Sequence, residues 1–484
     1  MANPFVTATP ESTGVSSRSL TAFVGKLREH GLCMHGVLVF KGGSLIAEGY
    51  APPYDANRKH RMYSISKSFT ALGVGLLIDD GKLKLTDRIA DFYPEYAAGP
   101  VHPLIAETTV RDMLTMRDPH DYTLTGLADW FTVPPSHPAG TIFTYNTTCT
   151  NLLAGIVEKI SGATLMEFLY PRLLAPIGFS DGCGCVKGHR GHSWSGSGIL
   201  CTARDLARLA LCCMNNGRWD GKQLISEAFI KEATSRIVDT TIDRNDTDHW
   251  QGYGYQIWRT RRNGFGFLGM GTQLAIALPE KDMLLVTTAD TQGVIPDSAV
   301  VMDAFYSIVY DPASNAPLPE DPAAQQELTR ALGGMELVNS PGIAASPNAS
   351  AISGAQYRLM FNRCGWTDAR FEFNGGEGRL IYTNDRGEKI IPFGFGSQIK
   401  FAFPETHYPG MTLRKPAGRG YETHASAGWL DDDTLSIHCW ITDDYCGSLR
   451  INAHFKDGRV TIFMKKAAEF FLDEYQGWIY GYAV

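Results

Sequence analysis

The sequence lacks both a long apolar run and a block of like charges. Its most apolar stretch, residues 71–78, is far shorter than the roughly 20 residues of a membrane-spanning helix, so we expect no membrane association. The N-terminus has neither a basic region nor an apolar core, which predicts that no secretory signal peptide is present. Acidic residues outnumber basic ones by 51 to 44, and this balance argues against nucleic acid as a partner. We therefore expect a cytoplasmic protein.

The chain has 484 residues, of which 44% are hydrophobic and 20% are charged, as in ordinary globular proteins. This length exceeds what one core comfortably holds, so two domains are expected. The ten cysteines are interpreted as reduced thiols, because a chain of this size can build its core without disulfides. Cys183 and Cys185, with His189 and His192 nearby, leave a zinc site as an alternative. Their spacing does not match the common zinc motifs, and no metal or cofactor is expected.

Alternation, periodicity and turn residues predict the secondary structure of the first 310 residues. Two β-hairpins are expected, one from residues 36–40 and 44–47 and one from residues 274–278 and 283–288. Residues 64–79 are apolar on nearly every side, which predicts a buried helix. Further helices are expected at residues 151–160, 202–214 and 297–310, the last with Asp297 as its N-cap.

The character of the chain changes at residue 311. We predict a first domain over residues 1–312, a proline-rich linker over residues 313–330 and a second domain over residues 331–484. Short alternating segments separated by Gly, Asp and Asn predict an antiparallel β sandwich or barrel there. We expect several aromatic side chains of this domain to be exposed, namely Trp366, Tyr408, Trp440, Tyr445, Trp478 and Tyr480. We also predict that the domain borders the active site, partly through the loop at residues 404–410. The alternative is that they fill its core or a dimer interface.

A Ser-x-x-Lys motif occurs twice. Ser64 and Lys67 open the predicted helix at residues 64–79, where a spacing of three places both side chains on one face. Ser397 and Lys400 lie in a strand-like segment, where the same spacing points them to opposite faces. Only the first pair can therefore bring an amine to a hydroxyl. The alternative for this pair is a serine that caps a buried helix, with the lysine extending outward.

The surrounding sequence resembles the serine β-lactamase-related family, which is similar to penicillin-binding proteins. That family includes class C β-lactamases, D,D-peptidases, D-aminopeptidases, family VIII carboxylesterases and 6-aminohexanoate-dimer hydrolases. The matches occur in family order between about residues 10 and 310, at residues 60–72, 79–87, 109–116, 143–145, 152–158, 198–207 and 252–258. The resemblance implies an α/β (α+β) fold, in which an antiparallel sheet flanked by helices joins an all-α subdomain.

The resemblance assigns further site residues, two of which depart from the family pattern. Tyr145 matches the catalytic tyrosine of a Tyr-x-Asn motif, but Thr147 stands where asparagine is expected. Tyr145 could instead be a core aromatic. The third motif, usually Lys-Thr-Gly or His-x-Gly, is matched by Phe267-Leu268-Gly269, which has no cation. A cation there would pair with a substrate carboxylate, and Arg259, Arg261 or Arg262 could replace it.

The predicted chemistry is acyl transfer through Ser64 as nucleophile. A serine hydroxyl needs a base, which Lys67 can supply as a neutral amine, while Tyr145 moves the proton to the leaving group. Thr147, Phe267, Gly269 and Met270 are predicted to bind substrate, with backbone N–H groups of residues 64 and 270 holding the oxyanion. We expect an esterase or amidase with a small-molecule substrate. A D-aminopeptidase or D-amino-acid amidase, a β-lactamase-type activity and a non-catalytic binding protein are the alternatives, and a homo-oligomer is left open.

Overall fold

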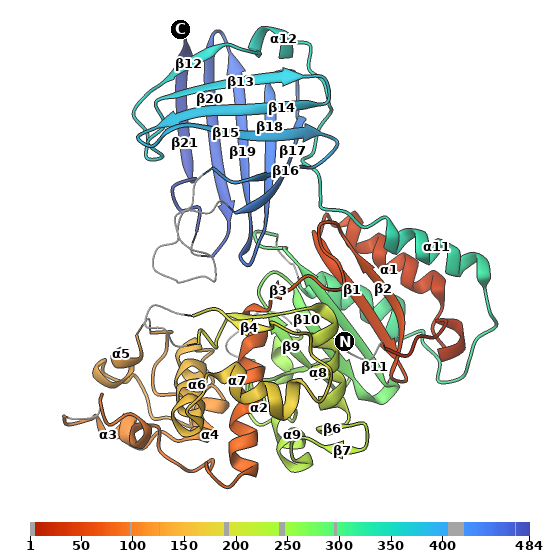
Figure 1. Ribbon diagram of the computed structural model, residues 1–484, viewed down its shortest axis with the longest axis vertical. Coiled ribbons are helices and arrows are strands. Elements are labelled where there is room, and N and C mark those ends of the chain that lie inside the picture. The colour runs from red at the N-terminus through yellow and green to blue at the C-terminus, as the bar shows by residue number, and fades with distance from the viewer. Residues whose placement is uncertain are drawn as a thin grey trace. The chain divides into compact units, whose positions relative to one another are not determined.

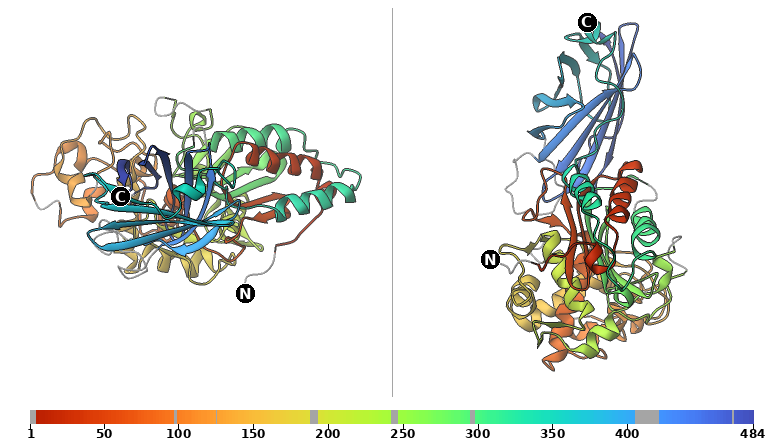
Figure 2. Two further views of the ribbon diagram at one scale, coloured as in Figure 1. Left: turned by 90° about the horizontal axis from the view of Figure 1, so that it is seen from above. Right: turned by 90° about the vertical axis from the view of Figure 1, so that its right-hand side faces the viewer.

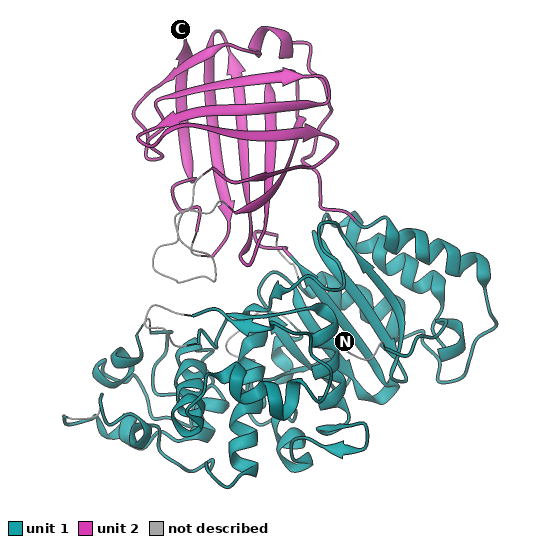
Figure 3. Ribbon diagram, viewed as in Figure 1, with its two compact units in different colours: residues 1–289, 296–335 teal, residues 290–295, 336–484 magenta. Residues whose placement is uncertain are grey.

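A computed structural model describes residues 5–96, 99–124, 126–187, 193–241, 247–294, 298–404, 421–469 and 471–484. The chain divides into two units (Figure 3). Unit 1 consists of Met1–Ala289 and Pro296–Met335, and unit 2 of Asp290–Ile295 and Glu336–Val484. No helix within the described ranges is long and apolar enough to cross a membrane.

Unit 1 is built on a six-stranded antiparallel sheet in the order β2-β1-β11-β10-β9-β8 (Figure 1). Its strands are β1 (Met34–Lys41), β2 (Ser44–Tyr50), β8 (Trp258–Thr260), β9 (Gly264–Gly269), β10 (Gln273–Leu278) and β11 (Met283–Ala289). Both predicted hairpins are confirmed, as β1–β2 and as β10–β11. All residues of β1, β10 and β11 are buried, which explains why their sequences are nearly continuous apolar runs.

Helices pack on this sheet and on one another. Helix α8 (Ala203–Met214) contacts β1, β10 and β11, and Thr202 begins it with a capping box. Helix α1 (Ser17–Glu29) packs against α10 (Ser298–Ala304), the π-helical turn η7 (Phe305–Tyr310) and α11 (Pro322–Gly333); α1 and α11 lie side by side in Figures 1 and 2. The predicted N-cap Asp297 lies outside the described residues.

A mainly helical region makes up the rest of unit 1. Its central helix α2 (Ser66–Asp79) packs against α6 (Thr147–Ser161) and α7 (Leu165–Leu169), and nearly all of its residues are buried, as predicted. The other helices are α3 (Pro103–Ala106), α4 (Val110–Leu114), α5 (Leu127–Thr132) and α9 (Glu227–Ala233). The single-turn elements are η1 (Glu11–Thr13), η2 (Tyr63–Ile65), η3 (Ile89–Phe92), η4 (Tyr170–Leu174), η5 (His249–Gln251) and η6 (Pro279–Lys281).

Two short sheets complete unit 1. The three-stranded sheet has the order β3-β5-β4, and the other sheet is a two-stranded hairpin. Their strands are β3 (His60–Arg61), β4 (Gly184–Cys185), β5 (Ile199–Cys201), β6 (Arg218–Trp219) and β7 (Lys222–Gln223). Pairing of β3 with β5 brings residues 60–61, just before the Ser-x-x-Lys motif, beside residues 200–201.

Over its described residues, unit 2 is a β barrel with one short helix, α12 (Ala349–Ile352). The ten strands found there run in the order β15-β14-β13-β12-β21-β20-β19-β18-β17-β16, and a parallel pairing of β15 with β17 closes nine of them into a ring. The strands are β12 (Gln356–Leu359), β13 (Asp368–Asn374), β14 (Glu377–Asn384), β15 (Gly387–Phe395), β16 (Ile399–Ala402), β17 (Glu422–Trp429), β18 (Thr434–Thr442), β19 (Cys446–Lys456), β20 (Arg459–Ala467) and β21 (Gly477–Ala483). The predicted antiparallel β domain is therefore a barrel.

The predicted linker needs correction, because much of residues 313–330 belongs to unit 1. Helix α11 starts within this segment and buries Leu328 and Leu332 in the same core as α1. An ion pair of 2.8 Å between Arg18 and Asp321 fixes its N-terminus. The proline-rich composition therefore marks a connection inside unit 1. The second and longer segment of unit 2 begins at Glu336.

The aromatics of unit 2 divide into two groups. Trp366, Trp440 and Tyr445 are buried within the described structure, contrary to the prediction that they are exposed. Trp366 stacks on Tyr382, for example, with ring centroids 3.9 Å apart. Trp478 and Tyr480 are 70% and 50% exposed, as expected. Tyr408 and residues 405–410 lie outside the described residues, and the prediction that unit 2 borders the active site stays a prediction.

Candidate active site

Ser64 lies in the turn that leads into α2. The turn η2 includes Ser64, and α2 begins two residues later. Tyr63, directly before the serine, has φ of 46°, a left-handed conformation that is uncommon for a bulky residue. Its fully buried ring and the surrounding core hold this conformation against its cost. The hydroxyl of Ser64 is thus carried by a backbone bend that the fold imposes.

Lys67 is the residue that contacts Ser64 from the first turn of α2. Its Nζ lies 3.0 Å from Ser64 Oγ, the geometry expected for residues three apart in a helix. The same Nζ donates a hydrogen bond of 2.7 Å to the carbonyl oxygen of Gly196. The side chain is buried, with 2% of its surface exposed, so its amine is held in place by these two oxygens. The outward-pointing alternative for this lysine does not fit the structure.

Tyr145 faces the same amine from another part of the chain. Lys67 Nζ lies 5.0 Å from the centroid of the Tyr145 ring. The ring stacks on Trp258 of β8, with centroids 5.6 Å apart and an interplanar angle of 26°. Trp258 is in turn packed edge-on against Tyr253 and His249. This aromatic cluster fixes the plane of the Tyr145 ring beside the Ser64–Lys67 pair.

The segment after Tyr145 is anchored by a buried carboxylate. Asp118, which has no exposed surface, accepts hydrogen bonds of 3.0 and 3.2 Å from Asn146 Nδ2, and a third from Trp130 Nε1. Asn146 Oδ1 accepts from the N–H of Thr148 and thereby caps α6. Thr147 consequently sits in the first turn of α6.

The residues of the third motif occupy different environments. Phe267, at 0% exposure, lies inside the core, which differs from the predicted contact with substrate. Its position on β9 explains this, since all its neighbours on that strand except Gly269 are buried too. A Cβ at Gly269 would approach the carbonyl oxygen of Met62 to 2.4 Å, so glycine allows β9 to pass close to the turn that bears Ser64. Met270 follows this close approach and is 40% exposed.

The three arginines that could replace the missing cation have other partners. Arg259 donates to the carbonyl oxygen of Thr234 at 2.9 Å. Arg261 pairs with Asp248 and Asp303, and Arg262 pairs with Asp311. Each guanidinium is thus committed within unit 1, and binding a substrate carboxylate would require giving up these contacts.

Of the residues in the alternative zinc site, the structure describes Cys183 and Cys185. The thiol of Cys183 donates to Asp205 at 3.4 Å, and burial, reinforced by that carboxylate, raises the pKa of Cys183 to about 12. His189 and His192 lie outside the described residues. None of the ten cysteines, all of them in the described ranges, forms a disulfide.

Two residues that sequence reasoning did not single out hold the segment around Gly196. Arg61, with no exposed surface, lies between the rings of Tyr63 and Trp194, 4.4 and 4.3 Å from their centroids. It donates to the carbonyl oxygen and the hydroxyl of Ser197 at 3.0 and 2.9 Å. Asn151 Oδ1 accepts a hydrogen bond of 3.2 Å from the N–H of Gly196. No local pattern reveals these contacts, because they join residues far apart in sequence.

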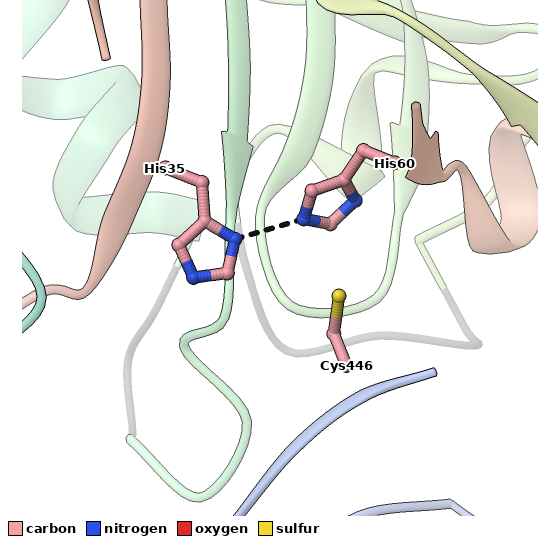
Figure 4. Close-up of side chains that lie close together, drawn as sticks. All are labelled: His35, His60 and Cys446. Atoms are coloured by element: carbon pink, nitrogen blue, oxygen red, sulfur yellow. Dashed lines mark hydrogen bonds between the residues drawn. The ribbon is translucent and has the colours of Figure 1, made fainter. Parts of the chain in front are cut away.

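Two buried histidines, His35 and His60, form a pair, and His60 precedes Ser64 by four residues. His35 Nδ1 and His60 Nε2 are 2.8 Å apart (Figure 4), and His60 Nδ1 is 2.9 Å from the carbonyl oxygen of Arg61. Because that carbonyl can only accept, His60 donates from Nδ1 and its Nε2 accepts from His35. Burial lowers the pKa of His60 to about 4 and holds the pKa of His35 well below its usual range. Both imidazoles are therefore neutral near pH 7.

The chain is similar to known proteins in sequence and in fold. A family model described as Beta-lactamase matches residues 21–302. The 6-aminohexanoate-dimer hydrolase of Paenarthrobacter ureafaciens is 28% identical over 222 residues, which cover 41% of this chain. The match spans just over half of that relative's length, 56%.

Two solved structures share the fold. One, from Bacillus anthracis and described as a candidate 6-aminohexanoate-dimer hydrolase, is 19% identical with a TM-score of 0.51, and the match covers 63% of this chain and 86% of that one. The other, a penicillin-binding protein homologue from Caulobacter crescentus, is 18% identical with a TM-score of 0.50, and the match covers 63% of this chain and all of that one.

Proposed function

This chain belongs to the beta-lactamase family, and from that premise we propose that it is a serine hydrolase that cleaves an ester or amide bond of a small molecule through an acyl-enzyme on Ser64. The observation that carries the proposal is the 3.0 Å separation of Lys67 Nζ and Ser64 Oγ in a buried setting. A hydroxyl this close to a lysine amine can lose its proton as it attacks a carbonyl carbon.

In the acylation step, Ser64 Oγ bonds to the substrate carbonyl carbon while the hydroxyl proton moves to Nζ of Lys67, which acts as the base. Tyr145, whose ring lies 5.0 Å from that amine, passes a proton to the leaving alcohol or amine as its bond to the carbonyl carbon breaks. The backbone N–H groups of Ser64 and Met270 would hold the oxyanion. The close passage of Gly269 to Met62 supports the second donor, because it brings the end of β9 toward the serine turn.

In the deacylation step, water attacks the acyl carbon and regenerates Ser64. The same pair, Lys67 and Tyr145, takes the proton from this water and returns one to Ser64 Oγ. The aromatic packing of Tyr145 on Trp258 keeps the phenol in position for both steps.

An uncharged acyl group is the substrate class that these residues favour. Position 267 bears a buried phenylalanine, and the guanidinium groups of Arg259, Arg261 and Arg262 are engaged elsewhere in unit 1. A substrate carboxylate would find no available cation at these four positions. A penicillin-like or D-alanine-terminated substrate is therefore disfavoured.

Amide cleavage is the second candidate, and one observation favours it. One relative that matches this chain is named as a hydrolase of the 6-aminohexanoate dimer. We therefore keep an amidase, including one for D-amino-acid amides, beside an esterase. Both use the same acyl-enzyme and differ only in the leaving group.

A substrate panel tests the proposal. p-Nitrophenyl esters, D-amino-acid p-nitroanilides and amides, and nitrocefin are offered to the full chain and to Ser64→Ala. We expect turnover of at least one uncharged ester or amide by the natural chain and none above background by Ser64→Ala. Equal turnover by both proteins would overturn the proposal. Preference between the ester and amide arms decides which of the two candidates holds.

A further inference from the structure

We infer that Asn151 is a positioning residue of the candidate site, which fixes the Gly196 peptide so that its carbonyl oxygen holds the Lys67 amine against Ser64. This inference rests on the proposed function for its catalytic meaning, and on the hydrogen bonds of Gly196 for its geometry. It concerns a residue outside the matched motifs, one helical turn beyond Thr147 on α6.

The Gly196 residue is held at both of its polar groups. Its N–H donates to Asn151 Oδ1 at 3.2 Å, and its carbonyl oxygen accepts from Lys67 Nζ at 2.7 Å. The hydroxyl of Ser195 also lies within 3.3 Å of Asn151 Oδ1, so the amide grips two consecutive residues. The N–H and the carbonyl group of Gly196 lie in adjacent peptide planes that meet at its Cα atom, so anchoring the first plane limits where the second can lie. Asn151 thereby sets where the acceptor for Lys67 points.

The direction of that acceptor matters for proton transfer. Lys67 Nζ donates to the Gly196 carbonyl at 2.7 Å and to Ser64 Oγ at 3.0 Å. The contact with Gly196 restricts the Lys67 side chain and keeps Nζ beside the Ser64 hydroxyl. Without the Gly196 contact the amine has Ser64 as its one remaining hydrogen-bond partner within the described residues. The base would then spend less time in the productive orientation.

Arg61 grips the next residue from the opposite side. Its guanidinium donates twice to Ser197 and is enclosed by the rings of Tyr63 and Trp194. The short segment 195–197 is thus fixed by an amide on α6 and by a guanidinium on β3. Tyr63 directly precedes Ser64, so the contacts of Arg61 form a clamp that connects the turn bearing Ser64 with the segment whose Gly196 carbonyl binds Lys67. Asn151 adds the contact that acts on Gly196 itself.

Thr147 meets Gly196 from the same helix as Asn151. A Cβ atom at Gly196 would stand 2.3 Å from the Cγ2 methyl of Thr147 and 3.4 Å from Asn151 Oδ1. Thr147 and Asn151 therefore share the face of α6 that meets Gly196, the methyl by packing and the amide by hydrogen bonding.

Three substitutions at Asn151 separate positioning from mere stability. Asn151→Ala and Asn151→Leu remove the acceptor, and the leucine keeps the volume in case the smaller side chain prevents folding. Asn151→Asp keeps an acceptor oxygen for the Gly196 N–H and should rescue. Asn57→Ala, an exposed asparagine replaced in the same way, is the matched control. Each full-length variant is compared in two readouts, its rate of labelling by a fluorophosphonate probe and its crystal structure.

We expect Asn151→Ala or Asn151→Leu to slow labelling by about 10²-fold, the cost of a misplaced catalytic group, with Asn151→Asp within about tenfold of the natural chain. With a turned-over ester the loss should appear in kcat and leave KM nearly unchanged. The crystal structure should show Lys67 Nζ displaced from Ser64 Oγ. A variant that keeps both Lys67 contacts, or one that labels at the natural rate, overturns the inference. If the natural chain itself is not labelled, the proposed function fails, while the position of Lys67 in the variant crystals still decides the inference.

Discussion

A Cβ atom on Gly196 would lie 2.3 Å from Cγ2 of Thr147, closer than any real contact of that kind. Glycine at 196 is therefore required by the threonine at 147, because a β-branched side chain in a helix has little rotamer freedom with which to move aside. The two residues belong to segments 49 positions apart and meet at the carbonyl that binds Lys67.

From this contact we predict that Gly196→Ala lowers probe labelling by at least about tenfold, since the segment must shift and carry its carbonyl away from Lys67. Thr147→Ser, which removes only the Cγ2 methyl, should restore much of the loss when combined with Gly196→Ala. Labelling rates of the four proteins of this double-mutant cycle measure the coupling. Purely additive effects would contradict the proposed contact.

Ser64 and Lys67 should behave as one catalytic unit. We predict that Ser64→Ala and Lys67→Ala each remove about as much esterase activity as the double variant, because the loss of either partner already ends the proton transfer. The test is kcat/KM of the three variants with a p-nitrophenyl ester. Losses that multiply in the double variant would show that the two side chains act independently.

β-Lactam hydrolysis should be weak or absent. Phe267 stands where related enzymes carry a cation, and the nearby arginines have carboxylate or carbonyl partners. We expect nitrocefin turnover to stay near background while an uncharged ester is hydrolysed. Efficient turnover would show that an arginine leaves its partner, and Arg259→Ala, Arg261→Ala and Arg262→Ala would then identify which one binds the carboxylate.

The buried histidine pair should make unit 1 sensitive to acid. The folded-state pKa of His60 is lowered from 6.5 to about 4, so the unfolded chain binds a proton that the folded chain does not. The stabilisation is therefore fully present above pH 6.5 and is lost as the pH falls toward about 4. At most it amounts to on the order of 3 kcal/mol, since each pKa unit corresponds to about 1.4 kcal/mol.

Replacing His60 tests this dependence. His60→Gln keeps a donor and an acceptor but cannot be protonated in this range, so protection from hydrogen exchange at residues 58–70 should fall less steeply between pH 6.5 and 4. His30→Gln, at an exposed histidine, is the control and should keep the natural slope. An unchanged slope in His60→Gln would show that other groups cause the acid sensitivity.

The sequence predicted the elements whose signals are local. The hairpin turns at Lys41–Ser44 and Leu278–Met283, the helix predicted at residues 202–214 and the apolar helix after Ser64 were all recognisable from neighbouring residues. The Ser64–Lys67 contact follows from helical spacing alone. These features need no knowledge of the rest of the fold.

What the sequence did not reveal depends on contacts across long separations. Arg61 meets Ser197 and Asn151 meets Gly196 only after β3 pairs with β5 and α6 packs on α2. Residues 313–330 have the composition of a linker, yet α11 covers α1 through two buried leucines. Trp366 and Trp440 belong to a set of aromatics that is larger than a small sandwich core needs, and exposure was therefore predicted for them. The nine-strand barrel has room to bury both.

The central claim is that Ser64 is the nucleophile, and the most direct measurement is the position of a covalent adduct. The full-length protein is treated with a fluorophosphonate probe, digested and analysed by mass spectrometry. Ser397 is an internal control, because it opens the second Ser-x-x-Lys copy but Lys400 is paired there with Glu422 at 3.1 Å. We predict one adduct, on Ser64, that disappears in Ser64→Ala and persists in Ser397→Ala. An adduct on another residue, or no adduct on the folded protein, would contradict the account.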